Sequence, residues 1–283
     1  MKKIYLLILF CVFYLSLSTV AAINETDTSI SNNPIAIDEN SCNSSIQNYN
    51  TIEITQDNYN NYFNQYTGEI KPGAHIKDGD VLKIGNISNH AFVIDRKLTL
   101  MPISPTDQIV NGFIHLVKGS DYSTITNLTI NNTGGILSIN SQDVGMLHGI
   151  WLSDTNYINI SYNVIRIANT GGVYAIPIHN SNHNIIVGND MKTWITSNII
   201  MADSNYNLIS RNRIEVLSYS DLSVTNLIYY SPFAFAGRLG SSQCLGNTIT
   251  YNNLIGFSTM PMSIIIQAIY ENNVNTTIAH NLI

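Results

Sequence analysis

The chain has 283 residues, of which 45% are apolar and only 11% are charged, less than half the roughly 25% of an average globular domain. A disordered chain is excluded, because disorder needs low hydrophobicity and high charge. The formal net charge of −6 leaves no basic surface to neutralise phosphates, which argues against a nucleic-acid partner. The 44 isoleucines and 38 asparagines are over-represented, and their order along the chain is more informative than their number.

Residues 1–22 have the pattern of a secretory signal peptide. Lys2 and Lys3 precede an apolar run, residues 4–17, and small residues follow it up to Ala22. The run is shorter than the roughly 20 residues of a membrane-spanning helix, and no later stretch is long enough to span a bilayer. We therefore expect a secreted or cell-surface protein with no transmembrane segment after signal removal.

Residues 23–50 are polar, rich in Asn and Ser, and without periodicity, which indicates a flexible leader. Residues 51–80 follow as an expected N-terminal cap, with a short helix over Asp57–Tyr66 and Asp57 as its N-cap. From residue 81 to 283 we expect a solenoid. It begins with three strand-length apolar segments at Val81–Ile84, Phe92–Ile94 and Leu98–Leu100.

An internal repeat follows. Three segments align without gaps at offsets of 26 and 23 residues, namely Gly149–Ile165, Ala175–Met191 and Asn198–Ile214. Two further copies keep only the end of the unit, with the pattern Ile-x-x-Asn-x-Ile/Leu, at Ile249–Leu254 and Ile278–Ile283. A period in the twenties with short strands predicts a solenoid. The chain stops in the middle of a repeat, which predicts a fragment, a truncated product, or a protein that depends on a partner at its end.

The residue types select a coil of parallel strands. Apolar residues two apart, such as Ile150 and Leu152, put one face of a strand inward. A leucine-rich repeat is excluded, because these units are β-branched and lack a returning helix. A recurring Asn suits a left-handed turn, and side-chain amides stacked about 4.8 Å apart can hydrogen-bond to one another. We expect such a ladder at Asn163, Asn189, Asn212, Asn252 and Asn281.

The Gly-Ile-x-Leu…Asn…Ile…Asn-x-Ile units resemble the right-handed parallel β-helices of the pectin-lyase-like type. The N-terminal segment is similar to the opening of methanogen adhesin-like surface proteins; it reads ITQDNYNNYFN…IKDGDVLKIGNISNHAFVIDRKLTL. The resemblance covers residues 52–283. It implies an all-β right-handed parallel β-helix with a short N-terminal capping helix, and a non-catalytic surface protein that binds cell-surface glycans or proteins.

The same fold also carries polysaccharide lyases and hydrolases, so an enzyme is the alternative. Its acids would be Asp154 and Asp203, which share one repeat column with Asn180 between them. Two rungs of about 4.8 Å would separate the carboxyl groups by about 9.6 Å, just beyond the spacing of an inverting glycosidase. Asp and Asn at this position more often bond turn amides, which favours the non-catalytic interpretation.

We expect neither metal nor cofactor. His179 and His183 are four residues apart, but they flank a strand-to-turn corner rather than lie on a helix. The offset of 40 residues between Asn212 and Asn252 predicts a long loop within residues 215–243. Its exposed candidates for ligand binding are Tyr229, Tyr230 and Arg238, although packing against the coil is an equally open role for the tyrosines.

Overall fold

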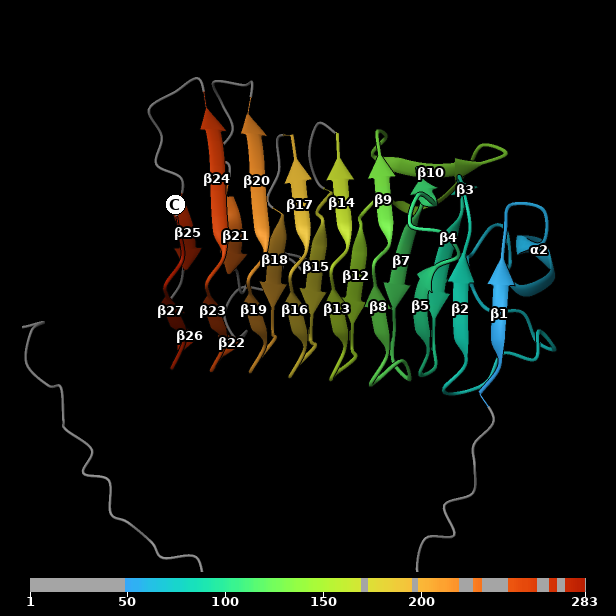
Figure 1. The fold of residues 1–283 in the computed structure, drawn as a ribbon, viewed down its shortest axis with the longest axis horizontal. Helices are drawn as coiled ribbons and strands as arrows, with labels where there is room; N and C mark the ends of the chain where they lie inside the picture. The colour runs from blue at the N-terminus through green and yellow to red at the C-terminus, as the bar shows by residue number, and fades with distance from the viewer. Residues whose placement is uncertain are drawn as a thin grey trace, which may run out of the picture. The chain divides into compact units, whose positions relative to one another are not determined.

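The computed structural model describes residues 49–168, 173–194, 198–218, 226–230, 244–258, 265–268 and 273–282. Nearly all regular structure in these residues is β, and most strands belong to three parallel sheets (Figure 1). This confirms the all-β class with long parallel sheets. The expected signal peptide, almost all of the expected leader, and Cys42 lie outside the described residues, and Cys244 is buried with a free thiol.

The described strands of each sheet, in spatial order, are as follows. The first sheet has nine: β1 (Thr51–Ile54), β2 (Val81–Ile84), β5 (Thr99–Pro102), β8 (Thr124–Thr126), β13 (Asn159–Ser161), β16 (Ile185–Val187), β19 (Leu208–Ser210), β23 (Thr248–Thr250) and β27 (Thr277–Ala279). The second has seven: β4 (Ala91–Ile94), β7 (Phe113–Leu116), β12 (Ile150–Ser153), β15 (Ile176–His179), β18 (Ile199–Ala202), β21 (Asn226–Tyr230) and β25 (Ile265–Ala268). The third also has seven: β3 (Ile87–Ser88), β6 (Gln108–Val110), β9 (Thr129–Asn132), β14 (Val164–Ile167), β17 (Asp190–Thr193), β20 (Arg213–Ser218) and β24 (Asn253–Ser258).

Successive strands visit the three sheets in turn. For example, β12 lies in the second sheet, β13 in the first and β14 in the third, after which β15 returns to the second. We call one such passage a rung. Neighbouring rungs pair in parallel, as in Leu152↔Ile178 and Ile165↔Met191, and among the described strands of the three sheets the register shifts at one place, between Asn226 and Ile228 of β21. Residues 51–80, expected as a cap, already contribute β1, which pairs with β2.

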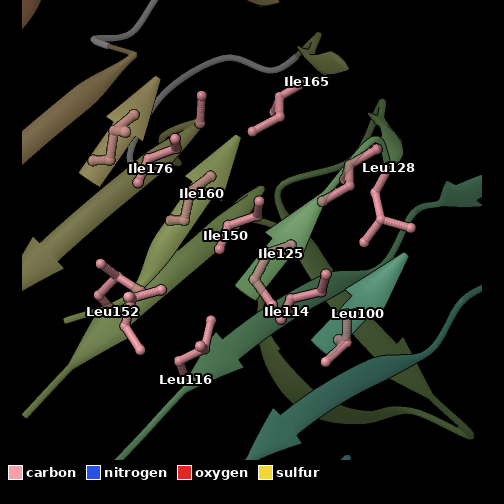
Figure 2. Close-up of a cluster of buried hydrophobic side chains, with 14 of the residues drawn as sticks. Leu100, Ile114, Leu116, Ile125, Leu128, Ile150, Leu152, Ile160, Ile165 and Ile176 are labelled. Carbon is pink, nitrogen blue, oxygen red and sulfur yellow. The ribbon is translucent and has the colours of Figure 1, made fainter. Parts of the chain in front are cut away.

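The core lies between the sheets and consists of stacked apolar columns. Each column takes one inward residue from every rung, because alternate side chains of a strand point to one face. Figure 2 shows inward side chains that come from different sheets and gather in one interior. One column, in the first sheet, is buried throughout and runs through Ile125, Ile160, Ile186, Ile209 and Ile249. Full burial of each such side chain contributes roughly 1.5–3 kcal/mol.

Two local elements differ from the expectation. The short helix α2 spans only Tyr59–Tyr62, and its N-cap is Asn58, so the prediction of Asp57 as N-cap is wrong. The side-chain oxygen of Asn58 instead accepts the N–H of Thr55, which precedes the helix, at 2.7 Å. The strands β10 (Ile136–Ile139) and β11 (Gln142–Met146) form an unexpected antiparallel hairpin, which packs through Leu137 and its neighbours on the outer side of the second sheet.

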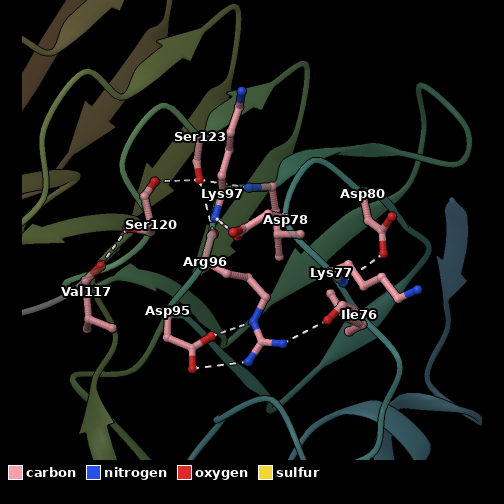
Figure 3. Close-up of polar contacts among 11 residues, drawn as sticks. Ile76, Lys77, Asp78, Asp80, Asp95, Arg96, Lys97, Val117, Ser120 and Ser123 are labelled. Atoms are coloured by element: carbon pink, nitrogen blue, oxygen red, sulfur yellow. Dashed lines mark hydrogen bonds and ion pairs between the residues drawn. The ribbon is translucent and has the colours of Figure 1, made fainter. Parts of the chain in front are cut away.

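Polar contacts fix the turns of the first rungs (Figure 3). Arg96 donates to the carbonyl of Ile76 at 2.8 Å and to the carboxylate of Asp95 at 2.8 Å. The carboxylate of Asp80 accepts the N–H of Lys77, also at 2.8 Å. The turn that holds Ser120 begins the repeating surface described next.

Candidate binding surface

A four-residue turn of one composition recurs where a strand of the second sheet leads into the next strand of the first sheet. We call these turns the tetrads: Gly119–Tyr122, Asp154–Tyr157, Asn180–His183 and Asp203–Tyr206. The backbone is left-handed at the first and fourth positions of every tetrad, with φ from 45° at Asn180 to 102° at Gly119. The four turns therefore have the same shape, and each position forms a column along the stack of rungs.

The second position is a buried hydroxyl that joins one tetrad to the next. The hydroxyl groups of Ser120 and Thr155 are 2.9 Å apart. The N–H of Thr155 donates to Oγ of Ser181 at 3.2 Å, and the N–H of Ser181 donates to Oγ of Ser204 at 3.2 Å. All four residues are fully buried. This column fixes the spacing of the exposed positions on either side of it.

The third position is a half-buried column of side-chain oxygens, which we call the amide column. The Asp121 carboxylate accepts the N–H of Asn156 at 2.6 Å. Oδ1 of Asn156 accepts the N–H and the side-chain amide of Asn182 at 2.9 and 3.1 Å. Asn182 accepts the same two groups of Asn205 at 2.8 and 3.0 Å. The outer edge of the column reaches solvent, so its amides are available to a ligand.

The first and third positions of the second and third tetrads, together with Asp121 of the first tetrad and Lys118, border a shallow depression of about 350 Å³. Across its floor, Nδ2 of Asn180 donates to Oδ1 of Asp154 at 2.5 Å. Lys118, Asp154 and Asn180 are exposed, whereas the amide column is partly covered. The depression is lined by Lys118, Asp121, Asp154, Asn156, Asn180 and Asn182.

The fourth position forms an exposed row of stacked rings, which we call the aromatic row. The ring centroids of Tyr122 and Tyr157 are 4.8 Å apart, those of Tyr157 and His183 are 5.0 Å apart, and those of His183 and Tyr206 are 5.0 Å apart. The planes are within 9° of parallel. The tyrosines are 48–59% exposed. Because the rings cover one another's faces, solvent meets their edges and the phenol hydroxyl groups.

The two predicted acids, Asp154 and Asp203, both occupy the first tetrad position. Asn180 stands between them in the column, and Asp154 is tied to Asn180 by the bond described above. Both residues are left-handed turn residues, a conformation that Asp tolerates better than most side chains. The arrangement is that of a turn column, in which the two carboxylates do not form a neighbouring pair.

The five predicted ladder asparagines lie at the opposite end of the first-sheet strands. From Asn189 onward, each side-chain oxygen accepts two bonds from the preceding Asn, at 2.9–3.0 Å in every step. The side-chain oxygen of Asn163 accepts the N–H of Leu128 at 3.0 Å. Asn163, Asn189, Asn212 and Asn252 are buried, and Asn281 is partly exposed. The ladder is therefore internal and contributes to stability rather than to a binding surface.

The sequence patterns did not predict a second buried ladder of asparagines. It joins Asn184, Asn207 and Asn247 through the same pair of bonds, at 2.8–3.1 Å. In the preceding rung the equivalent position is Ile158, whose N–H donates to Asn184. The column therefore changes residue type along the aligned repeats. The last three tetrads, by contrast, could have been predicted, because they recur at the same 26- and 23-residue offsets as the repeats themselves.

The predicted ligand-binding tyrosines are not in a loop. Tyr229 and Tyr230 lie in strand β21, where they pair with Ile200 and Met201 of β18. Strand β21 therefore occupies residues 226–230 of the segment 215–243 in which the long loop is expected. Arg238 lies outside the described residues.

Two histidines on the outer side of the second sheet have strongly shifted pKa values. The His115 ring stacks on Trp151 with centroids 3.9 Å apart, and His148 meets the same Trp edge-on. Burial lowers the pKa of His115 to about 4, against a smaller opposing effect of Asp154. Burial also lowers the pKa of His148 to about 4, and the charge of His115 acts in the same direction. Both rings are therefore neutral at pH 7.

Alternating charges cross the third sheet. Asp190 bridges Arg166 at 2.6 Å and Arg213 at 3.3 Å. Glu215 pairs with Arg213 at 2.6 Å and with Lys192 at 2.9 Å. Burial raises the pKa of Glu215, but hydrogen bonds from Lys192 and Arg213 outweigh it, and the pKa lies below its usual value. Each charged side chain of this group therefore lies beside at least one of opposite charge.

In the described parts of the chain, no group of three or more His, Cys, Asp and Glu side chains is arranged to hold a metal ion. Over the same residues, no helix has both the length and the apolar character needed to cross a membrane. Comparison of the chain with protein-family models, curated proteins and solved structures finds no match. The function must therefore be argued from the surface itself.

Proposed function

We propose that the protein is an exported, non-catalytic carbohydrate-binding module of the adhesin-like class. Its fold would be a right-handed parallel β-helix, with α2 as part of an N-terminal cap, and it would be secreted or displayed at the cell surface to bind glycans. The pattern of residues 1–22 supports export. The rotation of successive strands through three parallel sheets supports the β-helix.

The observation that carries the proposal is the aromatic row beside the polar depression. Each ring follows the amide-column residue of its own rung by one position, so the row runs alongside the depression. Sugars present hydroxyl groups and apolar C–H groups together, and a surface for them needs both hydrogen-bonding and aromatic partners. Amides, carboxylates and phenol hydroxyl groups supply the first, and the exposed edges of the stacked rings supply the second.

The test compares two tyrosines of one rung on a glycan array, followed by calorimetry with any glycan that binds. Tyr157 lies in the aromatic row, and Tyr162 lies at the far end of β13 against Gly188; their φ angles are 59° and 58°. Asn tolerates this backbone conformation, so Tyr157→Asn and Tyr162→Asn each remove a ring without adding backbone strain. We expect Tyr157→Asn to weaken binding at least tenfold and Tyr162→Asn to change it less than twofold. An array without any glycan signal would refute the proposal.

The polysaccharide-active enzyme is distinguished by turnover. A reducing-sugar and unsaturated-uronate assay over a polysaccharide panel is expected to stay blank. Turnover that Asp154→Asn or Asp203→Asn abolishes would replace the proposal with a lyase or hydrolase, because those side chains would then be its acids.

A further inference from the structure

We infer that the ligand of the tetrads is a linear glycan without acidic groups, which lies along the stack of rungs with one sugar against each tetrad. This inference rests on the proposed carbohydrate binding and adds the shape and the charge of the ligand. It is argued from the repeat distance of the surface and from the charges that line it.

The repeat distance favours a linear polymer. The aromatic row advances by 4.8, 5.0 and 5.0 Å per rung. The other tetrad positions follow the same spacing, because the hydroxyl column bonds each turn directly to the next. This advance is comparable to that of one pyranose unit in an extended chain. Four tetrads in register therefore offer four equivalent contacts to an unbranched glycan, and fewer to a branched or globular one.

The charge of the surface selects against acidic sugars. Asp121 and Asp154 line the depression together with Lys118, whose ammonium group is the one cation among the lining residues, and Asp203 continues the first column beyond Asn180. A uronate or sulfate placed on this surface would meet like charges, which is strongly unfavourable for binding. Neutral hydroxyl groups can instead donate to the free carboxylate oxygens, and an amino sugar would be attracted to them. The ring edges carry partial positive charge and suit neutral oxygen atoms.

The experiment measures the affinity of the full chain for matched oligosaccharides by calorimetry. Cello-, manno- and chito-oligosaccharides of two to six sugars are compared with oligogalacturonates of the same lengths. We expect at least one neutral series to gain tenfold or more in affinity from disaccharide to tetrasaccharide and less than threefold beyond it. We expect the matched hexagalacturonate to bind at least tenfold more weakly than the neutral hexasaccharide.

Charge variants locate the effect. Asp154→Asn/Asp203→Asn removes two carboxylates at positions where Asn180 already shows that Asn fits. We expect it to lower the ratio of neutral to acidic affinity at least fivefold. Asp143→Asn makes one such charge change in the β10–β11 hairpin, away from the tetrads, and is expected to leave the ratio unchanged.

Each contrary result points to a different failure. Acidic oligosaccharides that bind as well as neutral ones would overturn the ligand class and leave carbohydrate binding intact. Affinity that does not depend on length would overturn the alignment along the rungs. An equal response to Asp143→Asn would overturn the assignment to the tetrads. Binding to no carbohydrate at all would refute the proposed function as well.

Discussion

Replacing Asn189 with alanine tests how far the buried ladder holds the rungs together. Oδ1 of Asn189 accepts the N–H of Asn163 at 2.9 Å, and its Nδ2 donates to the carbonyl of Ile160 at 2.9 Å. The side chain is 1% exposed, so water cannot replace it. Asn189→Ala removes the ladder partner of both groups. Each group costs about 1–3 kcal/mol if it stays buried and unsatisfied, which gives about 2–6 kcal/mol in total.

Asn182→Ala is the matched control, because Asn182 lies in the half-buried amide column of the same rung and also accepts a backbone N–H, that of Asn205, while its Nδ2 donates to Oδ1 of Asn156. Water reaches the groups that it leaves, so we expect a loss of only about 0.5–1.5 kcal/mol. For a unit of this length, 1 kcal/mol shifts Tm by roughly 2–4 °C. Calorimetric scans should therefore show a drop of roughly 5–20 °C for Asn189→Ala and a few degrees for Asn182→Ala. Equal shifts would refute the claim that burial sets the strength of the ladders.

Two further predictions concern charge. The pKa values of His115 and His148 are about 4 in the folded protein, below the value of 6.5 in the unfolded chain. The contribution of each neutral ring to stability is therefore complete above pH 6.5 and is lost as the pH falls toward 4, by up to about 3 kcal/mol for each ring. Urea midpoints that do not change between pH 7.5 and 4.5 would contradict this prediction. Glu215 is 11% exposed and Asp190 is 37% exposed, so Glu215→Gln should cost about 1–3 kcal/mol and Asp190→Asn less than about 1 kcal/mol. Only the loss of stability in Asp190→Asn should vanish at 1 M salt. A larger loss in Asp190→Asn than in Glu215→Gln would contradict the argument from burial.

Much of the fold was predictable because each rung repeats the same local choices. Inward isoleucines two residues apart and an Asn at one corner recur at fixed offsets, and a stack of parallel strands is the structure in which both recurrences become contacts. The same reasoning located the ladder of Asn163, Asn189, Asn212, Asn252 and Asn281. It succeeded because a buried amide has one geometry that satisfies it, and that geometry needs another Asn in the next rung.

The binding surface was harder to predict, because its residues are exposed and satisfy no packing rule. Asp154 and Asp203 are candidate catalytic acids from the sequence, because glycoside hydrolysis needs two carboxyl groups. The tyrosines beside them belong to no motif of that kind. The 40-residue offset between Asn212 and Asn252 predicts a long loop with Tyr229 and Tyr230 in or beside it, and parallel pairing with β18 makes a strand of residues 226–230. Long-range pairing of this kind leaves no local signal in the sequence.

The aromatic row is difficult to explain by stability alone. A left-handed backbone costs a residue with a side chain roughly 1–2 kcal/mol, and four such residues stand in the row. The three stacked pairs return roughly 0.5–1.5 kcal/mol each, which does not offset that cost. The next two rungs place Gly246 and Asn275 at the same position, and both tolerate the backbone better.

The opposite end of the same strands gives the comparison. There the equivalent left-handed positions run Asn127, Tyr162, Gly188, Arg211, Tyr251 and His280. The Tyr251 and His280 rings stack with centroids 4.9 Å apart, but Gly188 and Arg211 separate them from Tyr162, so the rings form no continuous row. An unbroken row of rings therefore occurs where the polar depression lies, at the cost of backbone strain. Left-handed backbone occurs at both ends of the strands, so the continuity of the rings beside the depression, and not the strain, favours a ligand. The contrast between Tyr157→Asn and Tyr162→Asn is therefore the decisive measurement. If both variants gained stability equally and neither changed glycan binding, the row would have no role beyond the turn itself.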